Sequence, residues 1–248
     1  MTTPIHRKLV AEAAGTMFLV TAVIGSGIAA SRLSPQDTGL QLLENAIATG
    51  TALTALILAL QPVSAAFNPV VTVIEASEGT LGRGHAASAV GAQIAGGTLG
   101  AVIANLMFGL PAISVATTAR TGPGIWLAEV VATAGLVMVI GGTGRSGRAD
   151  WTAFAVGGYI TAAYWFTSST SFANPAVTIA RMLSDSFAGI APRSVPVFLV
   201  AQIVGGAVGY FLNQCLYPRR RFVGADLRTD EAVDAPQQHQ GRGQHEPH

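Results

Sequence analysis

Two Asn-Pro pairs, Asn68-Pro69 and Asn174-Pro175, are the residues whose types and spacing best suit a chemical role. Asn is a favoured N-cap of an α-helix, and Pro is tolerated at the first helical position because the N–H that it lacks would have no partner there. The pairs therefore predict short helices over 68–77 and 174–184. A helix start carries about half a positive charge, and an Asn amide donates hydrogen bonds. Such a site suits a small molecule that accepts hydrogen bonds.

The elements that must position these pairs are strongly apolar. Half of the residues are hydrophobic and 11% are charged, whereas a soluble domain has about 25% charged residues. Apolar stretches long enough to cross a bilayer as helices, about 20 residues, occupy 9–30, 43–63, 86–108, 124–142, 151–168 and 194–216. The sequence predicts an all-α integral membrane protein with six transmembrane helices plus two re-entrant half-helices. The first stretch could also be a signal peptide, but a matching copy later in the chain favours a span.

An internal repeat organises the chain. Three short motifs recur in the same order: Ala11-Glu12-Ala13 with Ala128-Glu129-Val130, the two Asn-Pro pairs, and 92–97 with 201–206. Each repeat, approximately 8–110 and 124–217, has three spans, so the second is inserted upside down and forms an inverted repeat. The half-helices then meet near the bilayer midplane. Non-helical backbone at that depth must line a polar path or be buried in protein, so we expect a pore through the chain.

Two acids lie at matched places in the repeats. Carboxylates are costly in lipid and usually face a partner in the protein interior. We expect Glu12 and Glu129 to accept hydrogen bonds from backbone N–H groups of the re-entrant loops, a structural role; the alternative is an acid at the headgroup boundary. Small-residue patterns on the third and sixth spans predict close helix packing at Gly96, Gly100, Gly205 and Gly209.

Basic residues predict the orientation. With both termini inside, the inner loops and tail carry more Arg and Lys than the outer loops, as expected for cytoplasmic termini; the inner set is Arg7, Lys8, Arg83, Arg145, Arg148, Arg219, Arg220 and Arg221, and the outer set is Arg32, Arg120, Arg181 and Arg193. The composition turns polar late in the chain. We expect a channel domain over 1–222 and a disordered tail over 223–248.

Several function classes are excluded. The net charge is +1 and the basic residues do not gather on one face, so nucleic-acid binding is not expected. The single cysteine, Cys215, cannot form an internal disulfide. The sequence has no spacing typical of a catalytic triad, a phosphate loop or a metal site, so we expect neither an enzyme nor a cofactor.

The paired boxes, the two acids and the Ala-Gln-Ile-x-Gly-Gly segments resemble the major intrinsic protein family, the aquaporins and aquaglyceroporins, over about residues 8–217. The resemblance implies a channel of six helices and two half-helices that assembles as a homotetramer with one pore per subunit. It also implies a pore midpoint made of Asn68, Pro69, Val70, Asn174, Pro175 and Ala176.

The resemblance also implies an outer filter. The residue after the second box is normally an arginine in this family, and here it is Val177. Arg181 follows four residues later, about one helical turn, and faces a similar direction, but it is expected to lie too far along to replace that arginine. Counting from the boxes places the filter at Thr49, Ala162, Ser171 and Val177. None of these is aromatic or charged, which implies a wide and less polar filter without arginine.

The function expected from this resemblance is a passive channel for small uncharged solutes in the plasma (inner) membrane. Its cargo would include water, glycerol, urea or neutral metalloid hydroxides such as arsenous acid, the neutral form of arsenite. Two alternatives remain open. One is an ion-coupled secondary transporter with broken helices, and the other is a family member whose pore is closed by Val70 and Val177.

Overall fold

The computed structural model describes residues 3–217, so the predicted polar tail over 223–248 lies outside the described residues. The elements within this range are helical, and their order follows the sequence prediction. The α-helices are α1 (Ile5–Leu33), α2 (Thr38–Leu60), α3 (Pro69–Ser77), α4 (Arg83–Met107), α5 (Pro123–Arg145), α6 (Thr152–Phe166), α7 (Pro175–Ala180) and α8 (Val195–Leu216).

The six predicted spans correspond to α1, α2, α4, α5, α6 and α8. Five of them are long and apolar enough to cross a membrane, and α6 is shorter, at 15 residues. A 3₁₀ turn, η1 (Ala149–Trp151), precedes α6 without a break. Together these two segments extend roughly 28 Å, which is close to the thickness of the hydrocarbon core of a bilayer.

The two short helices begin at the Asn-Pro pairs, as predicted. Asn68 accepts a hydrogen bond from Val70 N at 3.0 Å through Oδ1, and Asn174 accepts from Ala176 N at 3.0 Å. Proline occupies the first turn of both helices. The second short helix ends earlier than predicted, because after six residues it tightens into the 3₁₀ turn η2 (Arg181–Leu183).

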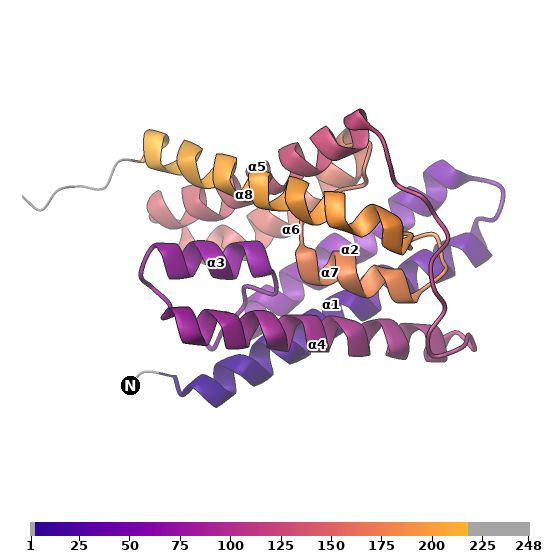
Figure 1. The fold of residues 1–248 in the computed structure, drawn as a ribbon, viewed down its shortest axis with the longest axis horizontal. Helices are drawn as coiled ribbons and strands as arrows, with labels where there is room; N and C mark the ends of the chain where they lie inside the picture. Colours follow the sequence, from indigo (N-terminus) through magenta and orange to yellow (C-terminus); the bar gives the residue numbers. More distant parts are fainter. Residues whose placement is uncertain (1–2, 218–248) are drawn as a thin grey trace, which may run out of the picture. The chain divides into compact units, whose positions relative to one another are not determined.

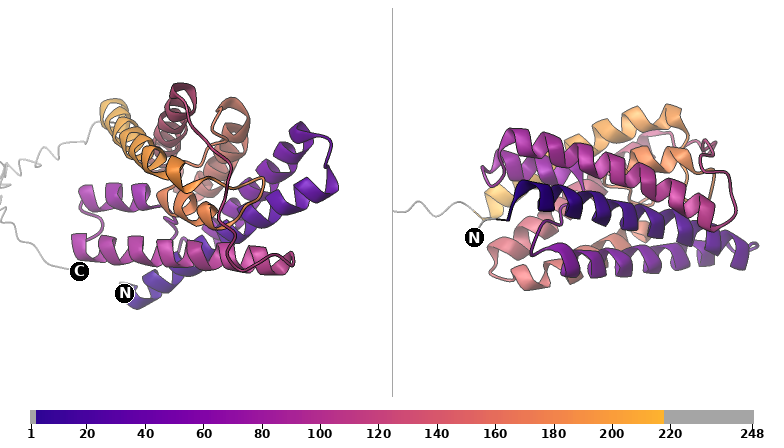
Figure 2. Two further views of the ribbon diagram at one scale, coloured as in Figure 1. Left: turned by 45° about the vertical axis from the view of Figure 1, so that its right-hand side comes forward. Right: turned by 90° about the horizontal axis from the view of Figure 1, so that it is seen from below.

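The repeats interleave around these short helices. Within the repeats, α4 packs on α1 and α8 packs on α5, while α2 and α6 join the two halves. Each half-helix also packs against the other repeat, α3 on α8 and α7 on α4. The N-terminal ends of α3 and α7 face each other in Figure 1, and Figure 2 shows the longer helices around them. This is the predicted inverted repeat of six spans and two half-helices.

Glycines permit the closest helix crossings. A methyl group on Gly96 or Gly100 would overlap backbone atoms of α1, and one on Gly205 or Gly209 would overlap backbone atoms of α5. These are the four glycines predicted to mediate packing. Small residues allow helix backbones to approach closely where lipid supplies no hydrophobic driving force between helices.

Replacing Gly100 with Ala tests this packing, with Gly91→Ala in the same helix as a control. The added methyl at Gly100 would overlap Met17 O, whereas none of the surrounding atoms lies within 4 Å of a methyl at the exposed Gly91. We expect Gly100→Ala to destabilise the protein by about 1–3 kcal/mol, and Gly91→Ala to be neutral or to stabilise it by up to about 1 kcal/mol. Thermal unfolding in detergent measures both, and equal shifts would contradict the packing role.

Candidate functional site

The two asparagines meet between the half-helices and are each held by the opposite loop. Asn68 donates from Nδ2 to Ala173 O at 2.8 Å, and Asn174 donates from Nδ2 to Phe67 O at 2.7 Å. The second N–H of each amide has no acceptor among residues 3–217. Both residues line a cavity, so two hydrogen-bond donors remain for a molecule inside it.

The loops that carry these asparagines have an unusual backbone. Phe67 and Ala173, the residues just before them, have φ of 48° and 49°, and Ser171 has φ of 47°. A non-glycine residue in this left-handed region costs on the order of 1–3 kcal/mol. The surrounding structure must therefore hold the loops in place.

Glu12 and Glu129 hold the two loops. Glu12 accepts hydrogen bonds from Ala66 N at 2.9 Å and Phe67 N at 2.8 Å. Glu129 accepts in the same way from Phe172 N at 2.9 Å and Ala173 N at 3.0 Å. Both carboxylates are fully buried, and these are the contacts that the sequence predicts for them.

Two glutamines complete this support, a role that the sequence analysis missed. Gln93 donates from Nε2 to Glu12 Oε2 at 2.7 Å and to Thr72 Oγ1 at 2.8 Å. Gln202 makes the equivalent pair of bonds, to Glu129 Oε2 and Thr178 Oγ1, both at 2.8 Å. They are the glutamines of the repeated Ala-Gln-Ile segments, so the recurrence of this motif was the sequence signal that could have indicated their role.

The cavity has a volume of about 340 Å³ and extends along both half-helices. One part of its wall is apolar and comes from the long helices: Leu19, Val23, Leu53, Ile57, Leu136, Ile140, Val156 and Ile160. The other part comes from the two loops, including both asparagines. A polar strip along an apolar wall can guide a small solute that accepts hydrogen bonds.

Three of the four predicted filter residues line this cavity, and Ala162 does not. Thr49, Ser171 and Val177 are lining residues, whereas Ala162 is exposed on the opposite side of α6. Tyr164, two residues further along, lines the cavity and donates from its hydroxyl to Thr49 Oγ1 at 3.2 Å. The prediction for α6 was wrong because two residues along a helix turn a side chain by about 200°.

The first box ends in Val70, which lies away from the cavity. Its side chain is buried beside Gly206 of α8, where a methyl group would overlap it. Pro69, Pro175 and Ala176 also build the helix starts without lining the cavity. The predicted midpoint set therefore divides into two asparagines that face the cavity and four residues that support them.

Arg181 lines the same cavity as Val177, although the sequence predicts that it lies too far along to replace an arginine at position 177. Its side chain is 1% exposed, and its guanidinium carbon lies 3.4 Å from the ring centroid of Phe172. Phe172 precedes the half-helix and Arg181 follows it, so the long side chain runs back along the helix. The four-residue spacing from Val177 predicts the direction of Arg181, but it does not predict the contact with Phe172.

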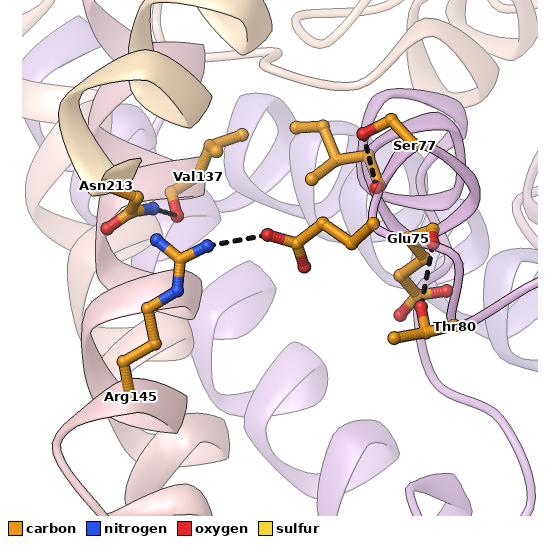
Figure 3. Close-up of polar contacts among 8 residues, drawn as sticks. Glu75, Ser77, Thr80, Val137, Arg145 and Asn213 are labelled. Carbon is orange, nitrogen blue, oxygen red and sulfur yellow. Dashed lines mark hydrogen bonds and ion pairs between the residues drawn. The ribbon is translucent and has the colours of Figure 1, made fainter. Parts of the chain in front are cut away.

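The opposite end of the cavity includes Glu75 of α3, which the sequence analysis did not single out. This end of α3 is tied to its surroundings. Thr80 donates from Oγ1 to Glu75 O at 2.7 Å, and Arg145 of α5 forms an ion pair with Glu78 at 2.6 Å. Figure 3 shows Arg145 beside Asn213, which donates to Val137 O at 2.8 Å. The ion pair with Arg145 ties this end of the half-helix to α5, and the bond from Asn213 ties α8 to α5.

Comparison with known proteins identifies the family and supports the fold. The sequence profile described as Major intrinsic protein matches residues 1–151, more than half of the chain. The chain belongs to this family. Its members are membrane channels, so this major intrinsic protein is a multi-pass channel protein for small solutes and not an enzyme.

Individual relatives cover most of this major intrinsic protein. The aquaglyceroporin AqpS of Rhizobium meliloti (strain 1021) is 47% identical over 211 residues, covering 85% of this chain and 90% of the relative. Aquaporin NIP1-2 of Arabidopsis thaliana is 29% identical over 239 residues, covering 91% and 78%. The X-ray structure of the aquaglyceroporin from Plasmodium falciparum superposes with a TM-score of 0.69 at 20% identity, covering 87% and 98%, and supports the fold.

The support of the second loop can be tested with Glu129→Gln. The substitution keeps the shape but turns one of the two acceptor oxygens into an N–H donor that faces a backbone N–H. Because a buried hydrogen-bonding group left unsatisfied costs about 1–3 kcal/mol, we expect a loss of stability of at least that size. Thermal unfolding in detergent gives the value. Asp150→Asn, at an exposed acid, is the control, and a shift no larger than that of the control would contradict the role of Glu129.

Proposed function

We propose that the protein is a passive channel for small uncharged solutes such as water, glycerol, urea and neutral metalloid hydroxides, including arsenous acid. The observation that carries this proposal is the cavity along both half-helices, with Asn68 and Asn174 in its wall. Among residues 3–217, one N–H of each asparagine amide has no acceptor and is available to a solute. A molecule with hydroxyl or carbonyl oxygens can exchange bonds to water for bonds to these donors.

Ions are poor cargo for this site. The N-terminal ends of α3 and α7 each present about half a positive charge to the midpoint, which repels cations. A small ion would also lose most of its hydration between the apolar walls. Glu12 and Glu129 do not offset these barriers, because their oxygens accept bonds from the loops.

The proposed cargo extends beyond water because Val177 stands where the family resemblance places an arginine. A valine donates no hydrogen bond and leaves room for a carbon chain. The name of the Rhizobium relative, an aquaglyceroporin, agrees with polyols as cargo. We propose that Thr49, Ser171, Val177 and Tyr164 form the constriction at the α7 end, with Tyr164 in place of Ala162.

The two alternatives receive less support. A coupled transporter needs carboxylates available to ions at the midpoint, and Glu12 and Glu129 are already bonded to backbone. A pore closed by Val70 conflicts with the position of that side chain against Gly206. A block by Val177 predicts no solute flux, which the measurement below tests.

The outer surface of the helix bundle indicates that the protein is surrounded by lipid or by other subunits. Large apolar side chains are exposed on the outward faces of the long helices, for example Phe18, Leu99, Phe154 and Phe211, as lipid or neighbouring subunits require. We propose a homotetramer with one pore per subunit in the plasma (inner) membrane. We propose that both termini lie in the cytoplasm, which the excess of basic residues in the loops and tail on that side supports.

Solute flux is the direct test of the proposed function. Vesicles that contain the purified protein should swell faster than empty vesicles when glycerol or urea replaces an impermeant solute at equal osmolarity. Stopped-flow light scattering measures the rates. Saturable uptake that needs an ion gradient would instead favour the coupled transporter, and swelling equal to that of empty vesicles for every solute would reject the channel.

Val177→Arg tests the constriction. The long cationic side chain should narrow the path and lower the ratio of glycerol to water permeability by about tenfold or more, because a barrier higher by about 1.4 kcal/mol has that effect. Ala162→Leu is the control, since a larger side chain outside the cavity should leave the ratio unchanged. Unchanged glycerol flux in Val177→Arg would show that the constriction lies elsewhere.

A further inference from the structure

Arg181 is the largest fully buried side chain among the described residues, and its charge has no carboxylate beside it. The ion pair within residues 3–217 joins Arg145 and Glu78 and does not involve Arg181. A buried charge is costly unless it is paired, hydrogen-bonded or used. The side chain is therefore a candidate for a functional role.

Two contacts fix the guanidinium of Arg181 in place. Its Nε donates to Ala188 O, and its planar group lies on the face of Phe172, 3.4 Å from the ring centroid. A cation on an aromatic face is favourable and is stronger when water is excluded. These contacts hold Nε and the plane of the guanidinium and do not involve a hydrogen bond from its two terminal nitrogens.

The two terminal nitrogens of the Arg181 guanidinium are available to the cavity. Neither terminal nitrogen of Arg181 has a protein acceptor within the described part of the chain, and the residue lines the cavity. Ser171 adds a second polar group there. Its side chain is 3% exposed, and its Oγ has no partner in the same part of the chain. Two polar groups with unfilled hydrogen-bonding capacity therefore face the same space.

Arg120 provides a contrast from the same neighbourhood. Its guanidinium lies 5.1 Å from the centroid of the Phe172 ring, but it donates to Gly189 O at 2.9 Å and to Phe187 O at 3.2 Å. It is not a lining residue of the cavity. One arginine beside Phe172 therefore braces the loop, and the other faces the path of a solute.

We propose that Arg181 determines the specificity of the α7 end of the pore. Its terminal N–H groups, with the hydroxyl of Ser171, donate hydrogen bonds to hydroxyl or carbonyl oxygens of the passing solute, and its charge keeps protons and metal cations out. The pore therefore has a cationic group although position 177 is a valine. The group belongs to Arg181, which lies one turn further along the chain and whose side chain points back toward Phe172. This inference rests on the channel function proposed above.

The test compares Arg181→Gln, Arg181→Lys and Arg120→Gln with the unchanged protein in vesicles. Entry of protons is followed with a trapped pH-sensitive dye, and glycerol and urea flux by swelling. Arg181→Gln should raise the proton leak by about tenfold or more, because a single charge a few ångströms from the path contributes more than that to the barrier. Arg181→Lys should keep the leak low, and Arg120→Gln should match the unchanged protein.

The outcomes separate this inference from the channel function. If the unchanged protein carries no solute, the channel function fails and this inference fails with it. If it carries solutes and folded Arg181→Gln leaks no more than Arg120→Gln, only the role of Arg181 is rejected.

A second measurement covers variants that do not fold. Methylglyoxal, a small uncharged reagent that removes the charge of arginine, is applied to the unchanged protein in vesicles, and mass spectrometry locates the adducts. We expect adducts on Arg181 and on the exposed Arg193, with the proton leak rising as Arg181 reacts. Reaction at Arg193 without Arg181, or reaction at Arg181 without a rise in leak, would overturn the proposal.

Discussion

The structure depends on satisfying backbone N–H groups where water and lipid cannot do so. The re-entrant loops leave the helical conformation in the interior of the helix bundle, and an unsatisfied buried N–H costs about 1–3 kcal/mol. Glu12 and Glu129 each accept two of these N–H groups. The carboxylates are held in turn by Gln93 and Gln202. The cavity between the half-helices therefore exists because buried acids from long helices stabilise backbone that could not otherwise lie there.

Much of this arrangement could be predicted from the sequence because it repeats. The Asn-Pro pairs set the starts of α3 and α7, since capping is a local property of a few residues. The matched acids were predicted to bind the loops, and the spacing of the spans gave the inverted topology. Gln93 and Gln202 were visible as a repeated motif, but their contacts depend on how α4 and α8 pack, which a one-dimensional pattern does not contain.

The lining of the pore was harder to predict because it depends on rotation and reach. Counting placed Ala162 in the wall, whereas α6 turns Val156, Ile160 and Tyr164 toward the cavity. The direction of Arg181 followed from its spacing, but its contact with Phe172 did not, because α7 gives way to a 3₁₀ turn and the side chain is long enough to reach back to that ring. A shift of one turn or two residues is small in the sequence, but it changes which side chains line a narrow pore.

The bonds around the two loops fall into two kinds, and the difference bears on how the chain assembles. The glutamate and glutamine contacts lie within one repeat, so each half can shape its own loop as soon as its helices pack. The asparagine contacts run between repeats, from Asn68 to Ala173 and from Asn174 to Phe67. When the first half emerges from the ribosome, Phe67 O and the amide N–H of Asn68 lack these protein partners until the second loop is made. The two halves thus share one architecture but do not form independent modules. Docking of one half against the other is the step that completes the path through the protein.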